Sequence, residues 1–495
     1  MSKKNVPSIA DPVDAPAGLR AGRAVFLVAA LAGAAAACYY AWVGLTLSHY
    51  DARAHLVVAR RVIDGLTPGW MQLGAFWLPL PHLLNLIPVQ LDWNFRTGFS
   101  AIAMSVLSLA VGLGALSRYL ARHTGSVVAA VVVPIAVLAN PNVLYLQSTP
   151  MTEPLLFGLS FVALLAVDTW IGSGRPRDAH GAGLVLSALV LTRYEGWLIG
   201  AVLVLVAWAA RRSLRDGATW LAVYPAVAIA AFFWLSYWSS GVLLATSGFY
   251  TPNNPARGSW LAAAGQIWWT TYAMAGPGIM VMGAVGVLVT LWRAATSRGR
   301  SLLPLSFFAT ALLPLVAFHA GHPQRVRYMV ALTVAAAVSA GLAFAIIPRR
   351  IITLLAMVFL SVSLTSRPPL STRAPMVVES QWEVPFGRDR RTVTNYLREH
   401  YDGTPIMASM GSLAHYMQET TSIGLSIRNF LHEGNGDLWS EAWLAPRHHV
   451  RWIMVEELAR GGGMLAVHAR ETPAFLDGFA RVSEGGGLAL YRRVR

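Results

Sequence analysis

Long apolar runs recur along most of this chain, and no other feature limits its possible folds as strongly. The run over residues 24–47 contains no charged residue. A helix needs about 17 to 25 mostly apolar residues to cross the hydrocarbon core of a membrane. Hydrophobic residues make up 55% of the 495 residues and charged residues only 13%, about half the charged share of a soluble globular protein. The sequence therefore predicts a polytopic membrane protein that is mainly α-helical.

We expect a transmembrane helical bundle of about eleven spans, because that many apolar runs approach spanning length. Two short runs flank Arg193, and these could also form one broken helix. The expected spans cover residues 24–47, 97–117, 125–139, 154–170, 181–191, 196–210, 219–238, 276–292, 302–318, 329–347 and 351–364.

The positive charge of the chain gives a test of orientation. A net charge of +15 could suit nucleic acid, but arginine and lysine also concentrate in short cytoplasmic loops of membrane proteins. If the N-terminus is cytoplasmic, every inner connection contains arginine. We therefore expect a cytoplasmic-membrane protein that contacts membrane lipids and no nucleic acid. The inner arginines are Arg118, Arg122, Arg175, Arg177, Arg211, Arg212, Arg215, Arg293, Arg298, Arg300, Arg349 and Arg350.

The composition changes after Ser366, where Pro368, Pro369 and Pro375 indicate a linker. Beyond them the apolar runs shorten to strand length, at residues 404–409, 450–455 and 487–491, with helical patterns at 390–400 and 413–418. We expect two domains, a transmembrane domain over residues 1–366 and a small α/β domain over 367–495. An odd number of spans places the second domain outside the cytoplasm.

The first outer loop, residues 48–96, begins with a segment that predicts an interfacial helix over residues 51–64. Asp51 and His55, four residues apart, share the face that would point toward the protein body. The alternative is that Asp51 only caps the helix, a role that aspartate fills well. The opposite face holds Arg53, Arg60, Arg61 and Asp64.

Prolines and aromatic residues dominate residues 74–84, later in the same loop. Prolines at positions 79 and 81 argue against a regular helix there, and aromatic side chains suit the membrane interface. We expect a rigid re-entrant rim, with a simple amphipathic connection as the alternative.

Carboxylates and an arginine mark two further outer connections. Glu153 lies at the outer end of an apolar run and Pro154 follows it, as at the start of a helix; its charge could also merely complement the helix dipole. Arg193 and Glu195 lie between two short apolar runs, where an uncompensated charge is costly. The alternative for this pair is an ion pair or a snorkelling corner.

The outer turn over residues 319–328 carries positive charge against the orientation trend. Arg325 and Arg327 could hold a phosphate group, since the planar guanidinium binds phosphate oxygens in pairs. His319 and His322 are too few ligands to predict a zinc site.

These segments, in this order, resemble the GT-C superfamily of membrane glycosyltransferases, particularly its protein mannosyltransferase and aminoarabinose transferase group. Asp51 matches the place of that group's catalytic acid, although Ala52 replaces the second acid often found there. Residues 77–83 resemble its proline-rich loop segment, Glu153 a recurrent outer carboxylate, and Arg327-Tyr328 the Arg-Tyr before a late span.

The resemblance implies an inverting transfer of a sugar from a polyprenyl-phosphate donor to a hydroxyl of a lipid, polysaccharide or protein acceptor, at the outer face of the membrane. Asp51 would act as general base, with Glu153 as a second catalytic carboxylate. Glu153 and Glu195 could orient the acceptor, the arginines or a divalent cation, but the ligands are too few to assign a metal. The expected substrate-binding residues are His55, Arg193, Glu195, His322, Arg325, Arg327 and Tyr328.

Two other classes of function compete with an enzyme. A transporter or flippase for a lipid-linked sugar would use the same arginines, but such proteins place their polar sites at mid-membrane and show internal repeats. A mere anchor for the C-terminal domain leaves the outer Asp51, Glu153 and Arg193 unexplained. The clustering of polar residues at one face favours the enzyme.

Overall fold

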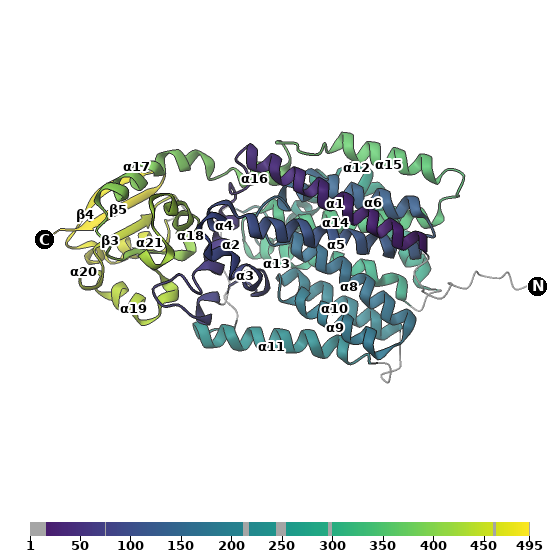
Figure 1. The fold of residues 1–495 in the computed structure, drawn as a ribbon, viewed down its shortest axis with the longest axis horizontal. Coiled ribbons are helices and arrows are strands. Elements are labelled where there is room, and N and C mark those ends of the chain that lie inside the picture. The colour runs from purple at the N-terminus through teal and green to yellow at the C-terminus, as the bar shows by residue number, and fades with distance from the viewer. Residues whose placement is uncertain are drawn as a thin grey trace, which may run out of the picture.

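A computed structural model describes residues 16–74, 76–210, 217–243, 254–295, 299–458 and 462–494. Helices run side by side in an elongated bundle, and a five-stranded sheet with its own helices lies at one end. The first helix, α1 (Pro16–Trp42), begins at the opposite end of the bundle (Figure 1). Short helices of the first outer loop lie between the bundle and the sheet.

Each of the apolar runs predicted to span the membrane falls on a helix of the bundle. Within the described residues, seven helices are long and apolar enough to cross a membrane. The protein is therefore a multi-pass membrane protein, and a total of about eleven crossings stays a prediction. The helices after α1 are α5 (Phe99–Thr124), α6 (Val127–Ala139), α8 (Glu153–Ser173), α9 (Pro176–Val190), α10 (Tyr194–Ala210), α11 (Trp220–Ser240), α12 (Trp260–Ala294), η4 (Arg300–Ala311) with α13 (Leu312–Ala320), η5 (Val326–Met329) with α14 (Val330–Ala343) and η6 (Phe344–Ile346), and α15 (Ile352–Ser366).

The two short runs around Arg193 form separate helices. Helix α9 ends at Val190, α10 begins at Tyr194, and the two pack against each other. The alternative of one broken helix is therefore wrong. Four of the arginines predicted to lie in inner connections, Arg211, Arg212, Arg215 and Arg298, lie outside the described residues.

Glycines let several of these helices approach closely. Gly112 on α5 faces Gly158 on α8, and a Cβ added to Gly112 would lie 2.5 Å from the Gly158 Cα. Gly286 on α12 lies against the backbone of Ser339 on α14. Small residues at such contacts allow helix backbones to pack together inside a membrane, where lipid offers no hydrophobic drive.

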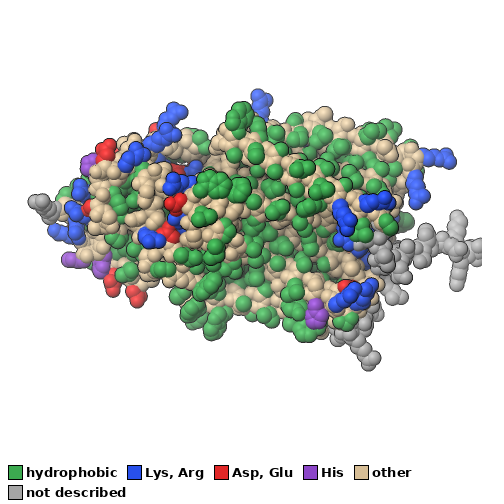
Figure 2. Space-filling model, viewed as in Figure 1, with side chains coloured by type: hydrophobic (Ala, Val, Ile, Leu, Met, Phe, Trp, Pro, Cys, Tyr) green, Lys and Arg blue, Asp and Glu red, His purple; other side chains and the backbone are tan. Residues whose placement is uncertain are grey.

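Figure 2 shows how the surface is divided along the long axis. Hydrophobic side chains cover the sides of the bundle, whereas arginines gather at its two ends, one of which carries the sheet. Such an apolar belt is the surface expected of a protein surrounded by lipid.

The C-terminal segment contains the three predicted strands and two more. The strands β1 (Ile406–Ala408), β3 (Trp452–Glu456) and β5 (Leu488–Arg493) match the predictions, while β2 (Phe430–Leu431) and β4 (Phe479–Gly485) were not predicted. The order is β2-β1-β3-β5-β4, parallel from β2 to β3 and antiparallel through β5 and β4. The accompanying helices are α17 (Val384–His400), α18 (Met410–Glu419), η7 (Thr420–Ile423), η8 (Ile427–Asn429), η9 (Glu433–Asn435), α19 (Asp437–Leu444), α20 (Pro446–His449), α21 (Met464–Glu471) and η10 (Pro473–Leu476).

The first outer loop forms short helices rather than a mainly irregular rim. The prediction of no regular helix over residues 74–84 is wrong for its second half, because Pro81 lies in the first turn of α3, where its missing N–H costs nothing. The short helices outside the predicted spans and before α17 are α2 (Tyr50–Arg60), η1 (Trp70–Leu73), α3 (Leu80–Asn85), η2 (Pro88–Gln90), α4 (Asp92–Thr97), α7 (Pro141–Leu146) and α16 (Pro375–Ser380).

The outer loop shares one hydrophobic core with the sheet region. Ala54 and Val57 of α2 belong to the same buried cluster as Leu413 of α18 and Trp452 of β3. Ion pairs support this contact: Arg53 pairs with Glu419, and Arg428 Nε lies 2.8 Å from Asp64 Oδ1. Helix α2 therefore lies between the bundle and the C-terminal layer, and its charged face is covered rather than open to water.

Candidate active site

Helix α2 places Asp51 in its first turn, where the side chain is buried with only 3% of its surface exposed. The N-cap is His49, whose Nδ1 accepts the Asp51 amide hydrogen at 3.1 Å. Burial lowers the pKa of His49 to about 3, so the ring is neutral and able to accept. The alternative that Asp51 serves as the helix cap is therefore wrong, and its carboxylate is free for another partner.

That partner is Arg327, which lies much later in the sequence. An Arg327 Nη1 forms a short ion pair with Asp51 Oδ2, across 276 positions of the chain. Both side chains are buried, so the negative charge of Asp51 compensates the positive charge of Arg327 where little water can do so. The structure thus brings together the predicted general base and a predicted phosphate-binding arginine.

A second buried cluster surrounds Arg193, at the start of α10. Its Nη2 and Nε donate to the two Glu195 oxygens at 2.8 and 3.2 Å, and its Nη1 donates to Thr152 Oγ1 at 3.0 Å. The same Nη1 lies 3.0 Å from Glu153 Oε1 without the alignment of a hydrogen bond. Glu153, 2% exposed, therefore has a countercharge, but no hydrogen-bond donor from the described residues reaches either of its oxygens.

The two clusters are electrostatic neighbours. Burial lowers the pKa of Arg193, but the negative charges of Glu153 and Glu195 outweigh burial and raise it above its usual value. The positive charge of Arg327 opposes this rise. Charges from four connections at the same end of the bundle therefore act on one another in a region of low dielectric, where electrostatic interactions are strong.

His55 lies one turn after Asp51 and belongs to a buried histidine pair. Its Nδ1 is 3.1 Å from His82 Nε2, and His82 Nδ1 is 3.1 Å from the Leu78 carbonyl oxygen. Burial lowers the pKa of His82 to about 3, and a carbonyl can only accept, so His82 Nδ1 donates to it and His82 Nε2 accepts from His55. Neutral His55 is thereby left with an unprotonated Nε2. The Trp77 ring lies 4.2 Å from the His55 ring.

The remaining predicted residues lie around the arginine turn that leads into α14. Arg325 covers the ring of Trp382 at 5.0 Å, and Arg327 lies 5.4 Å from the Tyr328 ring. His322 packs 5.7 Å from Tyr328 and is held through its own carbonyl by Asn254. His322 therefore supports the turn and has no described contact with Asp51.

His319 points elsewhere, because its ring stacks on Trp260 at 3.7 Å. In the part of the chain that the structure describes, no three His, Cys, Asp or Glu side chains are arranged to hold a metal ion.

Sequence reasoning missed Glu379 of α16. Its Oε2 accepts the Val326 amide hydrogen at 2.7 Å, next to both arginines of the turn, and burial raises its pKa. In the sequence this segment was interpreted as a linker. Pro375, followed by five residues that can form a helix, was a usable signal for a short helix.

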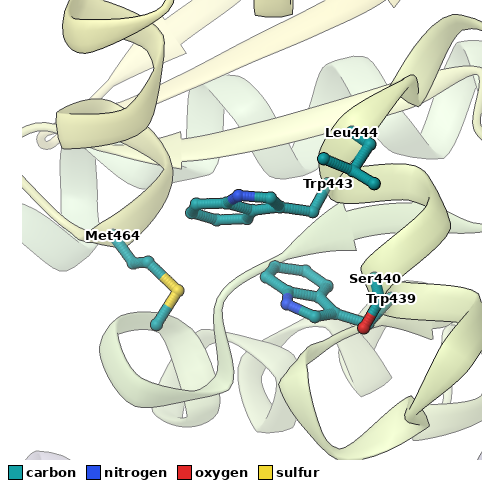
Figure 3. Close-up of a pocket in the computed structure, with 5 residues that line it drawn as sticks. All are labelled: Trp439, Ser440, Trp443, Leu444 and Met464. Carbon is teal, nitrogen blue, oxygen red and sulfur yellow. The ribbon is translucent and has the colours of Figure 1, made fainter.

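Two cavities differ in their chemistry. An open cavity of about 340 Å³ in the C-terminal layer is lined by Trp439, Ser440, Trp443, Leu444 and Met464 (Figure 3), none of which is ionisable. It offers no group for acid–base catalysis. A narrow cavity beside the buried clusters, lined partly by His55, His82 and Thr152, has a volume of about 10 Å³, which is room for about one water.

Comparison with known proteins gives the fold a precedent. No protein-family model and no curated protein sequence matches this chain. Solved structures of ArnT from Cupriavidus metallidurans do match it, two of them at 14% sequence identity. The structure bound to undecaprenyl phosphate has a TM-score of 0.57, and the match covers 93% of this chain and 97% of the ArnT chain. The apo structure has a TM-score of 0.55, and the match covers 92% of this chain and 97% of the ArnT chain. The predicted resemblance to the aminoarabinose transferase group is thereby confirmed at the level of the fold, which this chain shares with ArnT over nearly its whole length.

Proposed function

We propose that the protein is an inverting glycosyltransferase, which moves a sugar from a polyprenyl-phosphate donor to an acceptor hydroxyl at the outer face of the cytoplasmic membrane. The observation that carries the proposal is the buried contact between Asp51 and Arg327, beside the cluster of Glu153, Arg193 and Glu195. A base next to a phosphate-binding cation is what such a transfer needs. The undecaprenyl phosphate bound by ArnT, a protein of the same fold, supports the choice of lipid.

In the proposed reaction the Asp51 carboxylate takes the proton of the acceptor hydroxyl. The acceptor oxygen then attacks the anomeric carbon from the side opposite the phosphate, and the bond between that carbon and the phosphate oxygen breaks. The electron pair leaves with the phosphate, whose charge grows from −1 to −2. General-base assistance of this kind contributes about 10² to 10⁴-fold to a rate.

Arg327 links the two charge changes. As Asp51 gains its proton it loses its negative charge, so the hold of the carboxylate on Arg327 weakens while the phosphate becomes more negative. The guanidinium can therefore stabilise the leaving group as it forms, together with Arg193 and Arg325. Preorganised positive charge in a dry site is the larger kind of catalytic contribution.

The narrow cavity lined partly by His55, His82 and Thr152 has a volume of about 10 Å³, which is too small for a sugar. Among the described residues, no hydrogen-bond donor reaches the Glu153 carboxylate, so an acceptor hydroxyl or an incoming cation would satisfy it.

A panel of radiolabelled polyprenyl-phosphate sugars tests the proposal. Purified protein in detergent should consume one of them and release polyprenyl phosphate when an acceptor extract is added. The alternative, a transporter or flippase of a lipid-linked sugar, would leave every donor intact yet move it between leaflets of a reconstituted vesicle. Movement without cleavage would therefore overturn the transferase.

The orientation is tested separately. With a cytoplasmic N-terminus and an odd number of spans, the C-terminal sheet lies outside the cytoplasm. A tag placed after residue 495 should react with an impermeant reagent in intact cells. Labelling only after cell lysis would place Asp51 and the arginines on the cytoplasmic side and overturn an outer-face reaction.

A further inference from the structure

We propose that the segment over residues 375–382, here called the outer strap, is a positioning element of the candidate site and that Glu379 is its positioning residue. The strap comprises α16 and the turn that ends at Trp382. The inference rests on the proposed function, since it concerns how the phosphate-binding arginines are held. It assigns a role to a segment that the sequence presents only as a linker.

The first observation is the hydrogen bond to the arginine turn. Glu379 Oε2 accepts the amide hydrogen of Val326 at 2.7 Å, and Val326 lies between Arg325 and Arg327. This amide is the first of η5, so it has no acceptor within its own helix. The Glu379 carboxyl group supplies the missing acceptor, and the bond fixes the direction in which both arginines leave the backbone.

The second observation is that the strap also holds the other side of the site. Ser380, the next residue, receives a hydrogen bond from Ser48 Oγ at 3.1 Å, and Ser48 lies directly before the cap of α2. Tyr145 joins the same pair, with its hydroxyl 2.9 Å from Ser48 Oγ. Successive residues of one short helix therefore contact the segment that carries Asp51 and the segment that carries Arg327.

The third observation concerns Arg325, the other arginine of the turn. Its guanidinium lies 5.0 Å from the centre of the Trp382 ring, which belongs to the end of the strap. A cation over an indole ring is attracted without being neutralised. Arg325 is thus held in place while its hydrogen-bond donors stay available for phosphate oxygens.

Two properties of Glu379 have different effects on the arginine turn. Its function as a hydrogen-bond acceptor positions the turn, whereas its negative charge would compete with phosphate for the arginines. Burial raises the pKa of Glu379 against the pull of both arginines, which limits that competition. A neutral acceptor of the same shape should therefore serve as well as the carboxylate.

Three variants of the full-length protein separate these roles. Glu379→Ala removes the acceptor, Glu379→Gln keeps an acceptor oxygen without the charge, and Val378→Ala changes an exposed neighbour on the same helix. Each is measured by hydrogen–deuterium exchange over residues 325–329 and by binding of undecaprenyl phosphate. Melting temperatures identify any variant that has lost its fold.

Glu379→Ala should speed exchange at the Val326 amide and weaken undecaprenyl phosphate binding by about tenfold or more, as a buried amide left without its acceptor implies. Glu379→Gln and Val378→Ala should match the wild type in both measurements. Unchanged exchange in Glu379→Ala, or a Glu379→Gln variant as impaired as Glu379→Ala, would overturn the positioning role.

The exchange measurement also keeps this proposal separate from the proposed function. If the wild type neither binds undecaprenyl phosphate nor consumes any donor, the transferase proposal fails. Faster exchange in Glu379→Ala alone would still support a strap that positions the arginine turn, and unchanged exchange would refute it.

Discussion

At the scale of single residues, the Asp51–Arg327 pair differs from an ordinary surface ion pair because water is nearly excluded from it. The two side chains are 4% and 11% exposed. Exposed pairs contribute about 0 to 1 kcal/mol, whereas removing one partner of a buried pair costs about 3 to 5 kcal/mol, since the other charge is left uncompensated. A phosphate that replaces the carboxylate would restore the compensation, and this exchange is the basis of the first prediction.

Asp51→Asn should lower the rate of sugar transfer by about 10² to 10⁴-fold, because the general base is lost. Undecaprenyl phosphate should bind more tightly to this variant than to the wild type, since no carboxylate competes for Arg327. Donor turnover and binding of the lipid, measured side by side, check both parts. Asp437→Asn, at an exposed position outside the site, is the matched control, and a fully active Asp51→Asn would remove the base from the mechanism.

His432 gives a prediction about stability and pH. Burial, with a smaller contribution from Arg61, lowers the pKa of His432 to about 3 in the native protein. Above pH 6.5 the ring is neutral in both states, but between about pH 6.5 and 3 the unfolded chain binds a proton that the native protein does not. Stability should therefore fall as the pH falls, by about 1.4 kcal/mol per pH unit for this group.

His432→Asn should reduce this acid sensitivity. The histidine Nδ1 accepts the Gly434 amide hydrogen at 3.1 Å, and an asparagine oxygen can accept the amide two residues ahead in the same way. The melting temperature measured from pH 7 to pH 4 should thus decline less steeply in the variant. Parallel curves for variant and wild type would show that the proton is not excluded from His432.

At the scale of helices, contact between backbones makes some glycines irreplaceable and others free. An added Cβ at Gly286 of α12 would overlap the Ser339 carbonyl oxygen of α14, whereas one at Gly265 of the same helix would meet nothing within 4 Å. Gly286→Ala should therefore destabilise the protein by about 1 to 3 kcal/mol or more, as overpacking does. Gly265→Ala should be neutral or slightly stabilising, because alanine favours a helix.

The measurement is the melting temperature of both variants in the same detergent. A Gly286→Ala protein as stable as Gly265→Ala would mean that α12 and α14 do not touch as described. Activity should follow stability in this pair, since neither glycine contacts the buried clusters.

Element length decides how much of the structure the sequence could predict. The strands β1, β3 and β5 were predicted within a few residues. Each long apolar run falls on a helix, but the helix bounds differ more, since α12 begins at Trp260 and not at residue 276. The strand β2 has two residues and α16 has six, too few to show a period. Their structure comes from neighbours: β2 pairs with β1, and α16 packs on α7 and the arginine turn.

The same limit applies to the site. Asp51, Arg193 and Arg327 stand out in the sequence because charge is rare near a membrane-spanning helix. Nothing local could show that Asp51 meets Arg327, because that contact depends on how the helices between them pack. Glu379 did not stand out for the opposite reason: Pro375 could have indicated the short helix, but a carboxylate in an apparently soluble linker is ordinary.

At the scale of the whole molecule, the shared core ties the first outer loop to the C-terminal layer. Apolar side chains of α2 are buried against α18 and the sheet, and Arg60 and Arg61 are only 7% and 9% exposed. The domain boundary predicted at residue 366 divides the sequence, but residues from both sides of it pack into one hydrophobic core. The C-terminal layer thus covers the helix whose first turn holds Asp51.

Truncation after Ser366 should therefore damage the site even though it leaves the predicted spans intact. It removes the outer strap and exposes the apolar and charged faces of α2 together, and a helix of this length is only marginally stable without packing. When trypsin is added at the outer face of the membrane, it should cleave the truncated protein after Arg60 or Arg61. The full-length protein with a C-terminal tag should resist cleavage at these two positions. If the truncated protein resisted trypsin and still bound undecaprenyl phosphate, α2 would owe its position to the bundle alone, and the C-terminal layer would have no part in holding Asp51.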